Sequence, residues 1–200
     1  AYRRPNVPGL AEYEGRGVYF GASPVEGRLV QDQAVAVVGG GNSAGQAVVY
    51  LASKAKQVHL VVRQPLNTSM SQYLIDRIAN LPNVTVYVGY DLKELKGDGE
   101  QLQATVWQNM GTHQLLEAAT RYLFLFIGAI PQTNWLTPTG IKVDTRGFIL
   151  TGEELEFVLE SAGSVPIKRI PTYQTSVRNI FAIGDVRSGS VKRASAAVGE

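Results

Sequence analysis

The sequence of 200 residues contains no cysteine. It therefore cannot build a disulfide scaffold, a thiolate metal site or a cysteine nucleophile from its own residues. Long apolar runs are also missing, because the longest, residues 122–130, is too short to cross a bilayer and has the pattern of a buried strand with its turn. The formal net charge of +2 and the lack of a basic run argue against nucleic acid as a partner.

What is present is the composition of a folded globular protein, with 44% hydrophobic and 18% charged residues. No signal peptide and no membrane segment is visible, so a cytoplasmic location is the default expectation. The chain starts without methionine and stops inside an expected helix, at residues 198–200. We therefore expect it to be part of a longer protein.

The stretch that organises the chain is residues 34–48, AVAVVGGGNSAGQAV. Its five small or branched apolar residues predict a strand buried on both faces, as in a parallel sheet. The glycine turn and amphipathic helix that follow are typical of a pyrophosphate site, where free N–H groups and the helix dipole attract the anion. A bare structural turn is the alternative, but a second strand at residues 58–62 completes the strand–helix–strand unit. The residues predicted to hold the dinucleotide are Gly39, Gly40, Gly41, Asn42, Ser43 and Ala44.

Arg63 directly follows the second strand. Domains of this architecture that prefer NAD usually carry Asp or Glu at this place, bonded to the ribose hydroxyls. An arginine instead suits the 2′-phosphate of NADP, through charge-assisted hydrogen bonds. The sequence therefore predicts NADP(H), and the alternative interpretation of Arg63 is a solvated surface arginine.

The pattern up to residue 131 fits one nucleotide-binding domain. The helix after the second strand is expected to begin with Ser69 as its N-cap and to turn Tyr73 inward. The further expected elements are this helix at 69–81 and strands at 84–88, 102–106 and 122–127. We therefore predict an α/β, Rossmann-like, three-layer domain with a parallel sheet and a β-meander at residues 15–131, after a linker or remnant at residues 1–14.

The composition changes from residue 132 onward. Residues 179–185, NIFAIGD, predict an apolar strand that ends in Gly-Asp. A carboxylate fixed at such a strand end can accept hydrogen bonds from a sugar or ribityl hydroxyl. A simple turn is the alternative interpretation of this short motif.

Together these motifs resemble bacterial thioredoxin reductase and its relatives, in the same order and over nearly the whole chain. Residues 39–44 resemble the NADPH pyrophosphate motif of that family. Arg63 falls on the first arginine of its His-Arg-Arg motif, with Val62 and Gln64 in place of the other two. The resemblance implies further cofactor positions: Ile127 and Gly128 beside the nicotinamide, Gly184 and Asp185 at the ribityl chain of FAD, and Lys192, Arg193 and Ala194 at the isoalloxazine ring.

Two features depart from the family. Its Cys-x-x-Cys falls on residues 21–24, which are Gly-Ala-Ser-Pro here, and Ser23 cannot replace a thiolate because a hydroxyl lacks that redox chemistry. The family's FAD domain is discontinuous, and the half with its own glycine motif is absent from this chain. Residues 132–200 then match the returning, C-terminal part of the FAD-binding domain, which we expect to expose apolar surface and to bind FAD poorly.

The resemblance implies a flavin-dependent NAD(P)H oxidoreductase that passes hydride from NADPH to FAD and then to an unidentified acceptor, a small protein or a small molecule. It also implies a homodimer, while no side chain is predicted as a catalytic acid, base or metal ligand. Three alternatives stay open. They are a thioredoxin-disulfide reductase with cysteines outside this chain, a ferredoxin- or flavodoxin-NADP reductase, and a redox-silent NAD(P)-sensing module. A cyclic-nucleotide-binding module before residue 1 is a further expectation.

Overall fold

The computed structural model describes residues 2–163, 169–192 and 194–200. The chain divides into two compact units, residues 2–128 and residues 129–200. Among the described residues, no helix combines the length and the apolar character needed to span a membrane.

The unit of residues 2–128 is built on a five-stranded parallel sheet with the strand order β1-β8-β2-β3-β4. The strands are β1 Val18–Tyr19, β2 Ala34–Val38, β3 Gln57–Val62, β4 Val84–Val88 and β8 Tyr122–Leu125. Because every pairing is parallel, the carboxyl ends of all five strands lie along one edge. The chain runs outward from β2 through β3 to β4 and returns as β8 on the other side of β2. The strand order therefore reverses between β2 and β8, where ligands of open α/β sheets bind.

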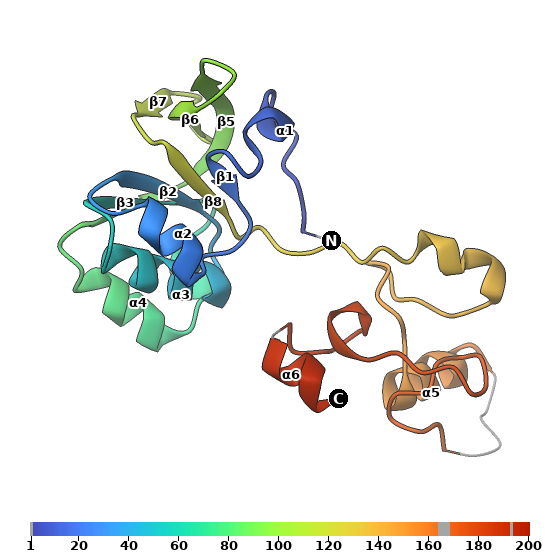
Figure 1. Cartoon of the computed structure of the whole chain (residues 1–200). Helices are drawn as coiled ribbons and strands as arrows, with labels where there is room; N and C mark the ends of the chain where they lie inside the picture. Colours follow the sequence, from blue (N-terminus) through green and yellow to red (C-terminus); the bar gives the residue numbers. More distant parts are fainter. Residues whose placement is uncertain (1, 164–168, 193) are drawn as a thin grey trace. The chain divides into compact units, whose positions relative to one another are not determined.

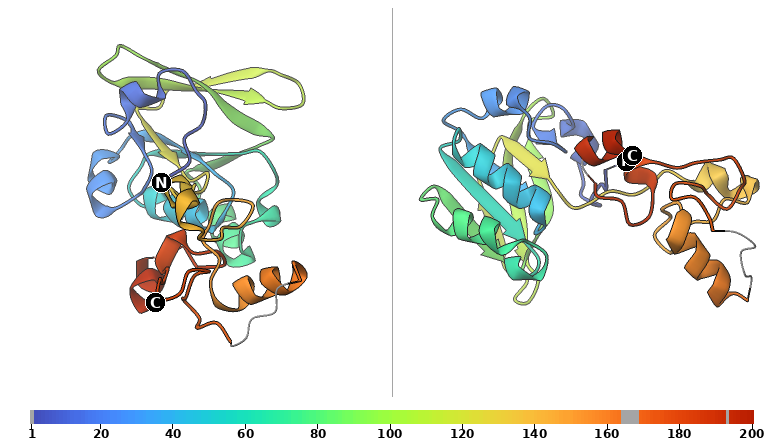
Figure 2. Two further views of the ribbon diagram at one scale, coloured as in Figure 1. Left: turned by 90° about the vertical axis from the view of Figure 1, so that its right-hand side faces the viewer. Right: turned by 90° about the horizontal axis from the view of Figure 1, so that it is seen from below.

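Helices cover one face of this sheet and a second sheet covers the other (Figure 1). The helical layer consists of α2 Pro24–Leu29, α3 Asn42–Ala52 and α4 Gln72–Ala79, and the antiparallel sheet of β5 Tyr90–Gly97, β6 Leu102–Asn109 and β7 Leu115–Ala118. Alternate residues of β2 serve the two layers, since Val35 and Val37 pack with the helices while Ala36 and Val38 pack toward β5 and β6. Figure 2 shows this layering of the unit from two further directions. The predicted α/β class is confirmed.

Three local expectations differ from the structure in this unit. Residues 2–14 are not a free linker, because α1 (Leu10–Tyr13) packs on the core and buries Leu10 and Tyr13. The helix expected from Ser69 begins at Gln72, with Ser71 as its N-cap. Tyr73 was expected inward but is 54% exposed, because it lies on the solvent side of the stripe that buries Leu74 and Ile78.

The unit of residues 129–200 has little regular structure. Its elements are η2 Asn134–Thr139, α5 Gly152–Ser161, η3 Gly184–Val186 and α6 Ala194–Gly199. The strand expected at residues 179–185 is wrong for this chain: Phe181 forms one isolated bridge with Gln174, and a 3-10 turn follows at Gly184. A strand needs a neighbour to pair with along its length, and among the described residues only the short segment 173–175 pairs with residues 180–182.

Candidate functional site

Gly39 opens the turn between β2 and α3, at the point where the strand order reverses. Its φ of 142° is one that residues with a side chain rarely adopt, and a Cβ at this position would collide with the Phe126 carbonyl at the end of β8. The Gly39 N–H donates to the Val61 carbonyl at 3.1 Å, and the Phe126 N–H donates to the Val38 carbonyl at 2.8 Å. Glycine is therefore required at position 39, because only a residue without a side chain allows the backbone to turn this close to the end of β8.

Gly41 differs from Gly39, since its φ of −92° and ψ of 179° are open to any residue and a Cβ there would meet nothing within 4 Å. It is the N-cap of α3, and its carbonyl accepts a hydrogen bond from the Gly45 N–H at 3.1 Å. The N–H groups of Asn42 and Ser43 lie in the first helical turn and have no intrahelical acceptor. In the part of the chain that the structure describes, the Gly40 and Gly41 N–H groups also have no acceptor. Free donors at the positive end of a helix are groups of the kind that bind anions such as a diphosphate.

The Asn42 side chain points to a neighbouring loop, residues 63–71, that leads from β3 to α4. Its Oδ1 accepts a hydrogen bond from the Ser71 N–H at 2.7 Å. The Ser69 hydroxyl donates to the Gly40 carbonyl at 3.0 Å. The glycine turn is thus tied at two points to a loop that lies 29 residues further along the chain.

Arg63 is exposed and directly follows β3, the neighbour of β2. Within the described residues it forms no ion pair, so its guanidinium is not neutralised by a carboxylate of this unit. Ile127 and Gly128 follow β8 on the other side of β2. Gly128 has a φ of 96°, and its carbonyl accepts a hydrogen bond from the Arg3 N–H at 2.9 Å. The sheet therefore brings the glycine turn, Arg63 and the residues after β8 to one edge.

Residues 21–24, where the resemblance would place a dithiol, form the start of α2 instead. Ser23 is the N-cap of this helix, and its Oγ accepts a hydrogen bond from the Val25 N–H at 3.2 Å. The Glu26 carboxylate accepts one from the Ser23 N–H at 2.8 Å, which completes a capping box. Its further hydrogen bond with the Ser23 hydroxyl lowers the pKa of Glu26. Ser23 therefore caps a helix at this position.

In the unit of residues 129–200, Asp185 lies exposed in η3. The turn before it needs glycine, because Gly184 has a φ of 71°. The Glu200 carboxylate holds this turn, accepting the Gly184 N–H at 2.6 Å and pairing with the Arg187 guanidinium at 2.5 Å. The hydrogen bond with Arg187 is the main cause that lowers the pKa of Glu200. It also raises the pKa of Arg187.

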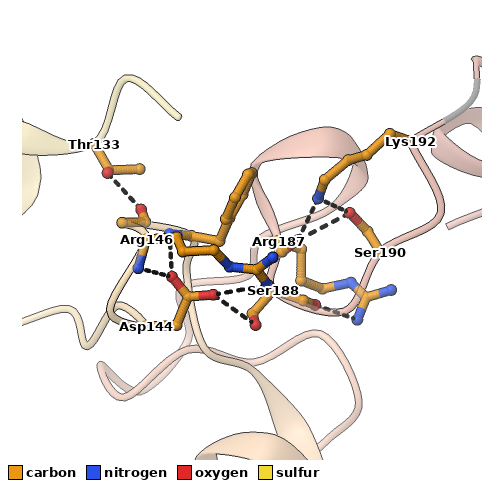
Figure 3. Close-up of polar contacts among 9 residues, drawn as sticks. Thr133, Asp144, Arg146, Arg187, Ser188, Ser190 and Lys192 are labelled. Atoms are coloured by element: carbon orange, nitrogen blue, oxygen red, sulfur yellow. Dashed lines mark hydrogen bonds and ion pairs between the residues drawn. The ribbon is translucent and has the colours of Figure 1, made fainter. Parts of the chain in front are cut away.

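Lys192 is turned back on its own segment (Figure 3). Its Nζ donates to the Arg187 carbonyl at 2.8 Å and to the Ser190 hydroxyl at 2.5 Å, and it lies 4.2 Å from the centre of the Phe148 ring. Burial lowers the pKa of Lys192. The ammonium group thus stabilises the segment after η3. Of the two neighbours expected at the flavin ring, Arg193 lies outside the described residues and Ala194 begins α6.

The Ser69 contact was missed from the sequence, which assigned Ser69 to a helix cap. A hydrogen bond across 29 residues leaves no local signal in the spacing of residue types. The only indication is that Ser69 falls in a polar loop directly after the strand that carries Arg63.

Comparison with known proteins agrees with this geometry. The model of the pyridine nucleotide-disulphide oxidoreductase family matches residues 1–200. Thioredoxin reductase of Mycoplasma pneumoniae is 33% identical over 198 residues, which cover 99% of this chain and 56% of that protein. Thioredoxin reductase of Ureaplasma parvum is 30% identical over 199 residues, which cover 99% of this chain and 57% of that protein.

Among solved structures, thioredoxin reductase of Lactococcus lactis superposes with a TM-score of 0.80 at 26% identity, covering 100% of this chain and 59% of that one. The enzyme of T. acidophilum gives 0.81 at the same identity and coverage. The chain therefore spans about half the length of these reductases. The predicted resemblance is confirmed, and the family supports both cofactors expected from the sequence, NADP(H) and FAD. Over its whole length, residues 1–200, this chain belongs to the pyridine nucleotide-disulphide oxidoreductase family.

Proposed function

We propose that residues 2–128 bind NADPH and form the nucleotide unit of a flavin-dependent NAD(P)H oxidoreductase. The observation that carries this proposal is the set of free N–H groups at residues 40–43, at the place where the strand order reverses. They would hold the pyrophosphate, and the unpaired Arg63 at the end of the adjacent strand would take the 2′-phosphate. A relative from Arabidopsis thaliana, 30% identical, is named NADPH-dependent thioredoxin reductase 3.

Residues 129–200 would contribute one side of an FAD site. Asp185 fits this role because its carboxylate is exposed beside a glycine turn that Glu200 fixes. The carboxylate would accept hydrogen bonds from ribityl hydroxyls, and the start of α6 would lie near the ring. FAD, when bound, supplies the flavin that takes up hydride from the nicotinamide. The remaining part of the FAD site would come from protein outside these 200 residues.

No dithiol of this chain can pass electrons to an acceptor, because the sequence has no cysteine. The residues on which the resemblance places the dithiol lead into α2 instead. We infer that electrons leave the flavin for another small protein or small molecule. A cytoplasmic homodimer is part of the same proposal.

Titration of this chain with NADPH and with NADH tests the assignment. Arg63→Ala is expected to weaken NADPH binding roughly tenfold or more, because a charge-assisted hydrogen bond is lost, and to leave NADH binding unchanged. Arg77→Ala, which removes an exposed arginine from α4 of the same unit, is the matched control. Equal affinity of the unmodified chain for both nucleotides, or an Arg63→Ala variant that binds NADPH normally, would remove Arg63 from this role.

A further inference from the structure

Ser69 lies outside the glycine motif and nevertheless contacts it. The residue stands between η1 (Leu66–Thr68) and α4, and its hydroxyl donates to the Gly40 carbonyl at 3.0 Å. A carbonyl in a half-buried turn could accept this hydrogen bond from water, so the contact is not needed to satisfy Gly40. What the contact does is fix the direction in which the carbonyl points.

The direction of the Gly40 carbonyl also fixes the direction of the Gly41 N–H. The peptide unit is planar and trans, so the carbonyl of one residue and the N–H of the next point in opposite directions. When Ser69 holds the Gly40 carbonyl on one side, the Gly41 N–H is turned to the other side. This N–H has no acceptor in the described part of the chain, and it lies directly before the first turn of α3.

The loop that carries Ser69 is itself fixed to α3. Met70 is buried, and its sulfur packs against Gly45, where an added Cβ would lie only 2.9 Å from it. On the other side of Met70, the Ser71 N–H donates to the Asn42 side chain. The two residues that follow Ser69 are therefore both anchored to α3, so Ser69 is presented to the turn from a fixed place and its hydroxyl does not have to be ordered when a ligand binds.

We infer that Ser69 is a positioning residue for the pyrophosphate, acting through the Gly40–Gly41 peptide. The inference rests on the proposed dinucleotide function of this site. It makes Ser69 independent of the 2′-phosphate, since NADPH and NADH present the same pyrophosphate to Gly41. Arg63 lies in the same loop, but its replacement should affect the affinity for NADPH and not that for NADH, because only NADPH carries the 2′-phosphate that Arg63 would bind.

The test is a set of dissociation constants for NADPH, NADH and ADP-ribose, measured on the full chain. Ser69→Ala is expected to weaken all three by the same factor, about three- to tenfold, which corresponds to the loss of one hydrogen bond. Ser69→Thr keeps the hydroxyl and should restore binding. Ser71→Ala is the matched control, because only the backbone of Ser71 contacts the turn and its side chain makes no capping bond.

Two results would overturn the inference. One is unchanged affinity for all three ligands in Ser69→Ala. The other is weakened binding of NADPH alone, which would show that Ser69 acts on the loop of Arg63 and not on the pyrophosphate. If the unmodified chain and the Ser71→Ala control bind none of the ligands, the proposed function itself fails, and this result is distinct from both. Thermal unfolding of each variant separates a loss of binding from a loss of fold.

Discussion

At the scale of single residues, the first and third glycines of the turn differ in what the fold requires of them. Gly39 is fixed by the fold, since its φ of 142° and the nearby Phe126 carbonyl leave no room for a side chain. Gly41 has ordinary dihedral angles and open space beside it. The sequence motif shows glycine at both positions, and only the structure separates the glycine that the fold requires from the one that has open space beside it.

This difference can be measured with two alanine variants. Gly39→Ala should lower the free energy of unfolding by about 1–3 kcal/mol from backbone strain, and by more where the contact with Phe126 cannot relax. Gly41→Ala should leave stability within about 0.5 kcal/mol of the original. It should weaken NADPH binding roughly tenfold, because its methyl group occupies the space where the pyrophosphate approaches the backbone. Urea unfolding and NADPH titration of both variants check this, and a Gly41→Ala chain that binds normally would contradict it.

At the scale of elements, the parts that were predicted from sequence are those specified by contiguous residues. The strand of residues 34–38 and the helix after it follow from an apolar run, a glycine turn and a helical stripe, all within one short stretch. The start of α4 was misplaced because Ser69 bonds to Gly40 and Asn42 reaches Ser71, and both contacts depend on tertiary structure. The strand expected to end at Asp185 was wrong for the same kind of reason, since pairing depends on distant residues.

A titratable side chain, His59, lies at the packing interface between the two sheets of residues 2–128. His59 of β3 packs on Trp107 and Tyr87, with ring centroids 5.4 and 5.7 Å away, and its Nδ1 lies 3.2 Å from the Tyr87 hydroxyl. Burial lowers the pKa of His59 below its ordinary value of 6.5. The unfolded chain therefore takes up a proton first as the pH falls. The stability that this packing provides is complete above pH 6.5 and declines as the pH drops toward the folded-state pKa.

We therefore expect His59→Phe, which keeps a ring in the cluster, to reduce the loss of stability between about pH 7 and pH 5. Fluorescence of the buried Trp107 during urea unfolding reports on this unit, after the 72% exposed Trp135 has been replaced by Phe. The same pH dependence in His59→Phe and in the unmodified chain would show that other groups dominate.

The turn at residues 144–148 is held by the side chain of Asp144. Asp144 Oδ1 accepts the N–H groups of Arg146 and Phe148 at 2.8 and 2.9 Å, and Oδ2 accepts the Ser188 hydroxyl at 3.1 Å (Figure 3). Burial pushes the pKa of Asp144 upward, but these hydrogen bonds outweigh it and the pKa is lowered. The stabilisation is thus present above the unfolded pKa near 3.8 and is lost as the pH falls through the lower folded value.

Asp144→Ala is expected to weaken hydrogen-exchange protection of the Phe148 amide by roughly two- to tenfold, because one backbone hydrogen bond is removed. Asp185→Ala is the control, since Asp185 is an exposed carboxylate of the same unit. Equal protection in both variants would show that Asp144 does not hold this turn.

At the scale of the whole molecule, the two units differ in how well they bury their apolar residues. The parallel sheet of residues 2–128 is covered on both faces by large apolar clusters. In the described part of residues 129–200 the apolar cluster is small and centres on Leu136, Ile149 and Ala182, with Phe148, Leu150 and Leu155 also buried. In the same unit, Phe181 is 58% and Ile183 52% exposed. These two residues flank the buried Ala182, directly before the turn that carries Asp185. The chain covers 56% of its Mycoplasma relative, and we propose that in a protein of that length further residues cover this segment.

This interpretation predicts that one double variant has different effects in two contexts. In the 200-residue chain, replacing Phe181 and Ile183 by serine should reduce binding of the dye ANS and leave the thermal unfolding temperature unchanged, because exposed apolar side chains stabilise little. In a longer polypeptide that includes this chain and reaches the length of the reductases, the same substitutions should lower that temperature and the amount of FAD retained on purification. Serine substitution of Tyr73, which is similarly exposed on the nucleotide unit, is the control for both contexts. A double variant that behaves alike in the short and the long chain would show that the segment before Asp185 stays uncovered in the longer protein.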